Sequence, residues 1–419
     1  MDIQFNYYKY ENNYLFSLLD YKELQRVPEG EIKNKKRIIY YLNRFSPLNS
    51  RKYFTISHPS LLFMEEEGLG LLRLDEKDYR ERVDKWILDK IDKREIGCIN
   101  TKYPNWTSIF NRKTKDKWKV NLIALGDVGS TLCIGLRLLG GECISEIGIY
   151  DRNINRLKRW EHELNQIKDP SGKLKLPKVV PIEKGHIFNC DMFIFCASKG
   201  VPPVGSQVED VRMVQFKSNS EIIAEYARLA MENRFQGIFA VVSDPVDLLC
   251  KVAFLESNKD CSGNFDFQGL SSDQIIGYGL GVMNARASFY AEKSPDTLHF
   301  IKEGRLFGPH GEGLIVADSI DNYNEEISNY LTEKTINANK VIRSFGYKPY
   351  IAPSLSSGAL SIIATIKGDW FYGSTYMKEV YMGARCRLLP TGMEVEQLRL
   401  PEKLYNRIQK TYDRLAVMV

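Results

Sequence analysis

The feature that most constrains the fold is a short apolar run that ends in a glycine turn and leads into a helix. In Lys119-Val-Asn-Leu-Ile-Ala-Leu-Gly-Asp-Val-Gly-Ser130 the apolar half predicts a buried strand, and a helix is expected over Ser130–Gly140. Gly126 and Gly129 lie in the turn with the spacing of the last two glycines of G-x-G-x-x-G, and Ala124 takes the place of the first. A strand, tight turn and helix in this order is typical of a parallel sheet covered by helices.

Strands and helices continue to alternate after this turn. The expected elements are strands over Glu146–Tyr150, Cys190–Cys196 and Gly237–Val242, and helices over Asn153–Ile167 and Ser220–Asn233. This order predicts an α/β fold with a Rossmann-type, doubly wound parallel sheet and helices on both faces.

The first 117 residues have a different composition, rich in Tyr, Lys, Asn and Glu, with short apolar clusters. Apolar residues recur at helical spacing over Asp75–Lys93, and Asp75 is a candidate N-cap. The stretch Gly97–Lys117, with Pro104 and a polar end, predicts a linker. We therefore expect a small N-terminal α+β module over residues 1–117, a Rossmann domain over 118–258 and a mixed α+β catalytic domain over 259–419.

Composition narrows the classes of function. The 58 basic and 53 acidic residues are interleaved along the chain, which argues against a nucleic-acid partner. Apolar runs stay short of the roughly 18–20 residues that span a membrane, and the N-terminus lacks a signal-peptide pattern. The eight cysteines contain no C-x-x-C pair and the five histidines are scattered. We expect a cytoplasmic protein with reduced thiols, no metal site and no membrane contact.

The glycine turn and the next strand have the spacing of a dinucleotide site. Glycines let backbone N–H groups at a helix N-terminus reach a pyrophosphate. The expected contacts come from Gly126, Asp127, Val128 and Gly129. Asp151 follows at the end of the next strand, where a carboxylate accepts hydrogen bonds from the adenosine ribose and disfavours a 2′-phosphate. The pattern favours NAD over NADP as cofactor, and the alternative is a tight turn that binds no ligand.

Six motifs after this turn resemble, in order, those of the lactate/malate dehydrogenase family. They are Phe195-Cys-Ala-Ser198, Arg212 with Asn219, Val241-Val-Ser-Asp-Pro-Val-Asp247, Ile276-Gly-Tyr-Gly279 with Asn284-Ala-Arg-Ala287, Gly308-Pro-His-Gly-Glu312, and Leu388-Leu-Pro-Thr-Gly392. The resemblance extends from about residue 118 to the C-terminus, and the first 117 residues have no counterpart in it.

The resemblance implies roles for three residues at the reacting end of the site. His310 would exchange a proton with the substrate, because an imidazole gains and loses a proton near neutral pH. Arg212 would polarise the substrate carbonyl when the covering loop closes. Arg286 would hold the substrate carboxylate through two hydrogen bonds. The alternative roles are a structural histidine, a solvated loop arginine and an arginine paired with a structural acid.

The resemblance also implies which residues hold the rest of the ligands. Ala197, Asn219 and Ser243 would lie along the nicotinamide end of the cofactor. The covering loop, Lys199–Arg212, carries Gln207, which is a candidate for recognising the substrate side chain.

The sequence departs from the family pattern at two positions. In the family, an aspartate three residues before the carboxylate-binding arginine orients the histidine, and here that position is Met283, which cannot accept a strong hydrogen bond. The family's asparagine in S-N-P-V-D is Asp244 here. Either Asp244 orients His310 in place of the missing carboxylate, or Asp244 meets a cationic group of the substrate, such as an iminium.

These observations predict an NAD-dependent dehydrogenase or reductase that acts on a small 2-oxo or 2-hydroxy acid or a related carboxylate. One alternative is an imine, amino-group or peptide-modifying reductase that uses Asp244, and another is a catalytically silent NAD-binding protein. The resemblance implies a homodimer or homotetramer. The N-terminal module would cap the active site, form an oligomer contact or recognise a larger, peptide-like substrate.

Overall fold

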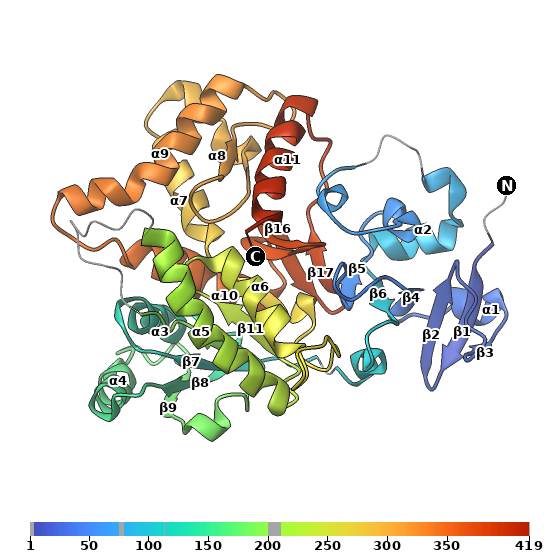
Figure 1. Cartoon of the computed structure of the whole chain (residues 1–419), viewed down its shortest axis with the longest axis horizontal. Coiled ribbons are helices and arrows are strands. Elements are labelled where there is room, and N and C mark those ends of the chain that lie inside the picture. The colour runs from blue at the N-terminus through green and yellow to red at the C-terminus, as the bar shows by residue number, and fades with distance from the viewer. Residues whose placement is uncertain (1–3, 75–78, 113, 200–210, 419) are drawn as a thin grey trace.

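A computed structural model describes residues 4–74, 79–112, 114–199 and 211–418, with only the backbone of 211–214 (Figure 1). Within these residues one 15-stranded sheet runs through the molecule. Its strands follow the order β3-β1-β2-β4-β6-β5-β17-β16-β15-β12-β11-β10-β7-β8-β9, so that N-terminal, C-terminal and central strands form three consecutive sections of the same sheet.

The central section is the predicted Rossmann sheet, and this prediction is confirmed. Its parallel strands are β7 (Trp118–Ile123), β8 (Ile144–Tyr150), β9 (Lys178–Pro181), β10 (Met192–Phe195), β11 (Ile238–Val241) and β12 (Ile275–Gly277). The helices are α3 (Asp127–Leu139), α4 (Ile154–Gln166), α5 (Val211–Glu232) and α6 (Val246–Ser257). Helix α5 begins nine residues earlier than the predicted Ser220.

Side-chain alternation along these strands explains why helices cover both faces of the sheet. Ile194 of β10 packs in one core cluster with α3 and α4, whereas Phe193 and Phe195 pack in a second cluster with α5 and α6. Successive side chains of a strand point to opposite faces, so a strand that is apolar at every position needs cover on both sides.

The C-terminal section has the predicted mixed α+β composition. Its antiparallel strands are β15 (Phe371–Met377), β16 (Val380–Leu389) and β17 (Gly392–Val395), and β13 (Arg305–Phe307) pairs separately with β14 (Ile315–Ala317). The helical elements are α7 (Leu280–Ala291), α8 (Phe300–Glu303), α9 (Glu325–Ser344), the π-helical η8 (Pro353–Leu360), α10 (Ser361–Lys367) and α11 (Glu402–Ala416), with short 3-10 turns η6 (Ser272–Gln274) and η7 (Pro295–Thr297).

The N-terminal section contains both strands and helices, as predicted. Its strands are β1 (Asn6–Tyr10), β2 (Asn13–Ser17), β3 (Gln25–Arg26), β4 (Ile39–Asn43), β5 (Tyr53–Thr55) and β6 (Ile96–Asn100). Its helical elements are α1 (Glu29–Lys33), α2 (Lys85–Asp92) and the 3-10 turns η1 (Pro59–Phe63), η2 (Leu69–Leu71), η3 (Arg80–Arg82) and η4 (Trp106–Asn111), and the turn η5 (Lys184–His186) lies further on in the Rossmann section.

Two local predictions in this section are wrong. The helix expected over Asp75–Lys93 begins only at Lys85, because Val83 is extended and ends a separate 3-10 turn; residues 75–78 lie outside the described part. A linker is expected from Gly97 onward, but the first residues of this stretch belong to β6. This strand lies inside the sheet, between β4 and β5. The close packing of Tyr53 requires a glycine at position 97, because a Cβ there would lie 2.6 Å from the Tyr53 ring. The chain does not turn at this residue.

The N-terminal module joins the rest of the protein through main-chain pairing. Strand β5 runs parallel to β17, with Phe54 opposite Met393. The backbones approach so closely that a Cβ on Gly392, whose φ is +104°, would lie 2.7 Å from the Cα of Phe54. The Thr55 hydroxyl donates to the Gly392 carbonyl at 2.8 Å. The module therefore lies beyond β15–β17, which separate it from the Rossmann strands in the sheet (Figure 1).

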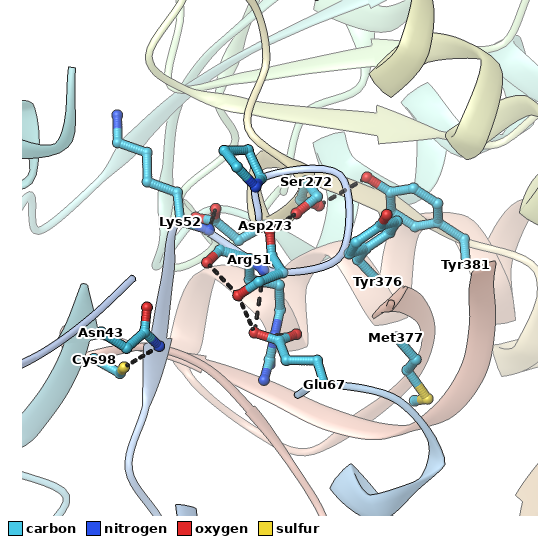
Figure 2. A network of polar contacts seen from close by, with 12 residues as sticks. Asn43, Arg51, Lys52, Glu67, Cys98, Ser272, Asp273, Tyr376, Met377 and Tyr381 are labelled. Atoms are coloured by element: carbon cyan, nitrogen blue, oxygen red, sulfur yellow. Dashed lines mark hydrogen bonds and ion pairs between the residues drawn. The ribbon is translucent and has the colours of Figure 1, made fainter. Parts of the chain in front are cut away.

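A buried polar network fixes the loop before β5. Figure 2 shows Arg51 and Glu67 facing one another, with Nε to Oε2 at 2.8 Å and side chains 3% and 0% exposed. Next to this pair, the backbone N–H of Lys52 donates to Asp273 Oδ1 at 3.0 Å, which links the module to η6. A buried ion pair is tolerated where further hydrogen bonds satisfy it, and the Arg51 N–H supplies one to Glu67.

The side chain of Lys52 carries a charge that the fold leaves largely uncompensated. Nζ donates to two neutral oxygens, Asn105 Oδ1 at 2.7 Å and Ser108 Oγ at 2.9 Å. Burial lowers the pKa of Lys52 from 10.5 to about 8, although the charge of Asp273 opposes this shift. Between these two values the unfolded chain binds more protons than the folded one, so stability rises with pH in this window.

We expect Lys52→Met to remove this rise. From about pH 8 to about pH 9.5 the Lys52 contribution should increase the unfolding free energy of the unmodified chain by about 1.5 kcal/mol relative to the variant. Urea unfolding at both pH values measures the difference, with the exposed Lys403→Met as control. An equal pH dependence in the chain and in Lys52→Met would contradict the prediction.

The glycine turn adopts the backbone that its sequence requires, with one strained residue. A Cβ on Gly129 would lie 2.1 Å from the Ala124 carbonyl oxygen, so only glycine lets α3 pack this closely on β7. Ala124, which replaces the first glycine, has a φ of +67°. The left-handed region costs a residue with a Cβ about 1–2 kcal/mol.

We therefore expect Ala124→Gly to stabilise the protein by about 0.5–1 kcal/mol, because the relief of strain exceeds the extra flexibility of glycine in the unfolded chain. Urea unfolding measures this change. In the matched control, Ala338→Gly within α9, the same exchange at helical φ should destabilise by about 1 kcal/mol. A destabilised Ala124→Gly would show that the left-handed backbone carries no strain.

Candidate active site

His310 lies in the loop between β13 and β14, and its backbone is anchored from two sides. Its N–H donates to Asp247 Oδ2 at 3.0 Å, while Ser374 Oγ donates to Asp247 Oδ1 at 2.7 Å. Gly308, with a φ of +98°, exchanges two backbone hydrogen bonds of 3.0 Å with Gly383 of β16. These contacts fix the main chain at His310 and do not involve the imidazole.

The imidazole is oriented by a backbone carbonyl. His310 Nδ1 lies 2.8 Å from the Gly279 carbonyl oxygen, which also accepts from Ser357 Oγ at 2.8 Å. A carbonyl oxygen only accepts, so the proton of the neutral imidazole resides on Nδ1. Nε2 of the neutral imidazole then carries no proton and is able to accept one. The Gly279 carbonyl thus orients the ring, for which Met283 offers no carboxylate.

Asp244 lies on the other side of the same ring. Its Oδ1 is 3.8 Å from His310 Nε2, within ion-pair distance of a protonated imidazole and beyond a direct hydrogen bond. Its side chain is half exposed, and its backbone carbonyl accepts from Asn219 Nδ2 at 2.7 Å. The two residues singled out by the sequence therefore meet, but Asp244 faces the reacting nitrogen and not the orienting one.

Arg286 of α7 is a largely buried cation close to this pair. Burial lowers its pKa, and the nearby charge of Asp244 opposes that effect. Its guanidinium donates to Asn339 Oδ1 and to the sulfur of Met283, both of them neutral. Among the residues that the structure describes, no carboxylate lies within ion-pair distance of Arg286. An arginine in this state is suited to a carboxylate ligand.

Two predicted site residues cannot be placed. Gln207 lies outside the described residues. Arg212 falls in the first turn of α5, where the backbone alone is described. Their predicted contacts with the substrate stay predictions.

The glycine turn fits a dinucleotide pyrophosphate. Gly126 precedes α3 as its N-cap without a side-chain cap, and a Cβ there would meet nothing within 4 Å. Open space in front of uncapped backbone N–H groups is the arrangement that binds a phosphate. Val128 and Gly129 follow in the first turn of α3. Asp127 at its start forms an ion pair of 3.1 Å with Lys348, so its charge is partly neutralised.

Asp151 stabilises the glycine turn through a hydrogen bond to its backbone. It lies just after β8, and its Oδ2 accepts from the Leu125 N–H at 2.8 Å. Its Oδ1 accepts from the Asn153 N–H at 2.8 Å, and Arg156 approaches Oδ2 at 3.4 Å. The predicted ribose contact would use the lone pairs that these bonds leave.

Three residues predicted at the nicotinamide end belong to a hydrogen-bond network inside the protein. Ser243 Oγ donates to the Ala197 carbonyl at 2.6 Å, which joins the carboxyl ends of β11 and β10. Asn219 is fully buried; its amide donates to Ser198 and Asp244 and accepts from the Lys199 N–H. The structure thus brings Ala197, Ser243 and Asn219 together. Their hydrogen bonds fix the segments that follow β10 and β11, and Asp244 lies in the second of these segments.

Four groups at the site gave no signal in the sequence reading: the carbonyl of Gly279 and the side chains of Ser357, Lys348 and Asn339. Each acts through a contact between segments far apart in the chain. Among the described residues no cluster of three or more His, Cys, Asp or Glu side chains is placed to hold a metal ion. Among them, too, every helix is too short or too polar to cross a membrane.

Comparisons with known sequences identify relatives of one kind. No family model matches the sequence. The chain is 26% identical over 201 residues to the L-lactate dehydrogenase of Geobacillus thermodenitrificans (strain NG80-2). It is 24% identical over 197 residues to L-lactate dehydrogenase 1 of Staphylococcus aureus (strain JH9). Each match covers 46% of this chain and 55% of the relative, so the chain spans about half the length of the curated relatives it matches.

Comparisons with solved structures give the same fold. A lactate dehydrogenase from a Medee basin deep-sea metagenome library superposes with a TM-score of 0.58 at 18% identity, covering 72% of this chain and 97% of that one. The minor L-lactate dehydrogenase of Enterococcus mundtii gives a TM-score of 0.57 at 18% identity, with the same coverage. The solved structures show the fold, and the sequence matches with the six motifs support a divergent lactate/malate dehydrogenase-like chain. The N-terminal module is additional to this resemblance.

Proposed function

We propose that this protein is an NAD-dependent oxidoreductase that transfers a hydride between nicotinamide and C2 of a small 2-oxo or 2-hydroxy carboxylate or a near relative. The observation that carries the proposal is the state of His310. Its Nδ1 is engaged by the Gly279 carbonyl, which leaves Nε2 for proton exchange. Nε2 faces Asp244, whose charge also acts on Arg286. A proton donor and a partly buried arginine that has no carboxylate partner among the described residues together suit a carboxylate undergoing oxidation or reduction at C2.

The cofactor would be held by residues on this chain's own strand ends. Gly126, Val128 and Gly129 would receive the pyrophosphate, and Asp151 the adenosine ribose, while Ala197 and Ser243 would line the nicotinamide end. The bound nicotinamide supplies or accepts the hydride. The carboxylate of Asp151 favours NAD over NADP by repelling a 2′-phosphate.

The chain's own chemistry is proton exchange and charge placement. His310 Nε2 donates a proton to the substrate heteroatom during reduction and removes it during oxidation. Arg286 holds the carboxylate and so fixes C2 relative to Nε2. Arg212 would add positive charge when the covering loop closes, as the resemblance implies. Asn339 and Met283 keep the Arg286 guanidinium in place without neutralising it.

The proposed function also suggests a substrate and an oligomeric state. We propose a small carboxylate as substrate, with a larger peptide-like one as the alternative, and a homodimer or homotetramer in the cytoplasm. The position of the N-terminal module beyond β15–β17 favours a structural or contact role over one in capping the active site.

The first test is calorimetric binding of NADH, followed by loss of NADH absorbance with a panel of 2-oxo acids, each with and without ammonium. We expect binding, turnover of at least one panel member, and a loss of kcat of at least about 10²-fold in His310→Gln with unchanged NADH affinity. The backbone bond to Asp247 survives this exchange. His299→Gln, which alters a histidine paired with Asp318, is the control. Absence of NADH binding would refute the proposal.

Arg286→Gln should affect substrate binding more than chemistry. Removing the partner of a carboxylate costs at least about 2 kcal/mol, so we expect KM to rise by at least about 30-fold while kcat falls less. Steady-state kinetics on the panel member that turns over give both values. Arg343→Gln on α9, an exposed position, should leave KM unchanged. An unaltered KM in Arg286→Gln would mean that the carboxylate binds elsewhere.

A further inference from the structure

Asp244 places a negative charge where a plain 2-oxo acid would develop one. A group that exchanges a proton with His310 Nε2 must come within about 3 Å of that nitrogen. Asp244 Oδ1 lies 3.8 Å from the same atom. An alkoxide forming at this point would face a carboxylate, and like charges at such separations repel. A cationic nitrogen at the same point would be attracted.

The charge of Asp244 is available to a ligand. In the part of the chain that the structure describes, His310 is its single ion-pair partner, and its side chain is 51% exposed. Its position is nevertheless well fixed, because Asn219 holds its backbone carbonyl at 2.7 Å and Pro245 follows directly. A fixed, exposed carboxylate is suited to binding a cationic group of a ligand.

Arg286 and Asp244 together give the site two opposite charges. The guanidinium has no carboxylate partner among the described residues, and it interacts electrostatically with Asp244 across the site. A ligand that matches both groups carries a carboxylate and a positively charged nitrogen. The proposed hydride transfer at C2 puts that nitrogen on the carbon next to the carboxylate. This is the charge pattern of a 2-amino or 2-imino carboxylate, and a 2-hydroxy carboxylate lacks its positive end.

We propose that the substrate is a 2-imino carboxylate, formed from a 2-oxo acid and an amine, whose iminium nitrogen is bound by Asp244 and whose carboxylate is bound by Arg286. This inference rests on the proposed hydride transfer and names the class of substrate for it. The product is the corresponding 2-amino carboxylate.

The step balances with a reduced nicotinamide as the reductant. C2 gains a hydride and a new C–H bond, and the C=N double bond becomes a single bond as its π electrons return to nitrogen. The amine formed is neutral and takes one proton from protonated His310 Nε2. The resulting ammonium keeps its ion pair with Asp244 until release. The reverse reaction removes the same hydride and proton.

Binding of matched product pairs tests the proposal by affinity, which does not depend on knowing which substrate turns over. The protein saturated with NAD⁺ is titrated calorimetrically with alanine and lactate, leucine and 2-hydroxy-4-methylpentanoate, phenylalanine and phenyllactate, and aspartate and malate. Members of a pair differ only in an ammonium or a hydroxyl group. We expect at least one amino carboxylate to bind at least tenfold more tightly than its hydroxy partner.

Asp244→Asn removes the charge and keeps the shape. We expect it to lose the amino preference and to bind the hydroxy partner at least as well as the amino one. Asp296→Asn, which removes a surface carboxylate elsewhere, should keep the preference. Thermal unfolding of each variant shows whether it folds, and the comparison within the unmodified protein decides the question if Asp244→Asn does not.

Each remaining outcome counts against a named claim. A preference for hydroxy carboxylates, an amino preference that survives in Asp244→Asn, or NAD⁺ binding with no amino carboxylate bound would overturn the imino substrate and leave the proposed hydride transfer in place. Failure to bind NAD⁺ at all would overturn the proposed function itself.

Discussion

The candidate site depends on one buried carboxylate, that of Asp247. It accepts the His310 N–H at 3.0 Å and the Ser374 hydroxyl at 2.7 Å, and so joins α6, the β13–β14 loop and β15. Burial raises the pKa of Asp247, and both hydrogen bonds favour the ionised form. A buried carboxylate is tolerated only where such bonds replace its hydration. The position of His310 is therefore set by its main chain, and the side chain is left free to react.

The charge balance around His310 differs from that implied by the family pattern. A carboxylate behind Nδ1 would stabilise the imidazolium from the side away from the substrate. Here the Gly279 carbonyl, a neutral dipole, occupies that side, and the carboxylate of Asp244 lies in front, toward Nε2. A charge in front of the histidine acts on the imidazole and on the bound ligand together. Under the proposed function, the negative charge near His310 would lie on the substrate side of the ring and not behind it.

The parts of this structure that the sequence predicts are those with local or repeating signals. Alternating apolar runs predict the Rossmann strands, and the carboxyl ends of parallel strands meet at one edge, so Asp244 and Asp151 could be placed from their position after a strand. Gly279 and Ser357 could not, because one acts through its carbonyl and the other lies some eighty residues away in η8. The prediction that a linker begins at Gly97 is wrong. A glycine that allows a turn and a glycine that makes room for a neighbouring ring cannot be distinguished in a sequence.

The N-terminal module acts on this site through the sheet. Without β5, β17 would be an edge strand with unpaired backbone groups, which proteins cover or blunt. The pairing of Phe54 with Met393 covers that edge. Strand β17 pairs with β16, and Gly383 of β16 holds Gly308 through two backbone bonds, two residues before His310. A Cβ on Gly383 would lie 2.5 Å from the Gly308 oxygen, so this contact is as close as the one that seats β5 on β17. The module therefore completes the edge of the sheet whose strand β16 holds the loop that carries His310.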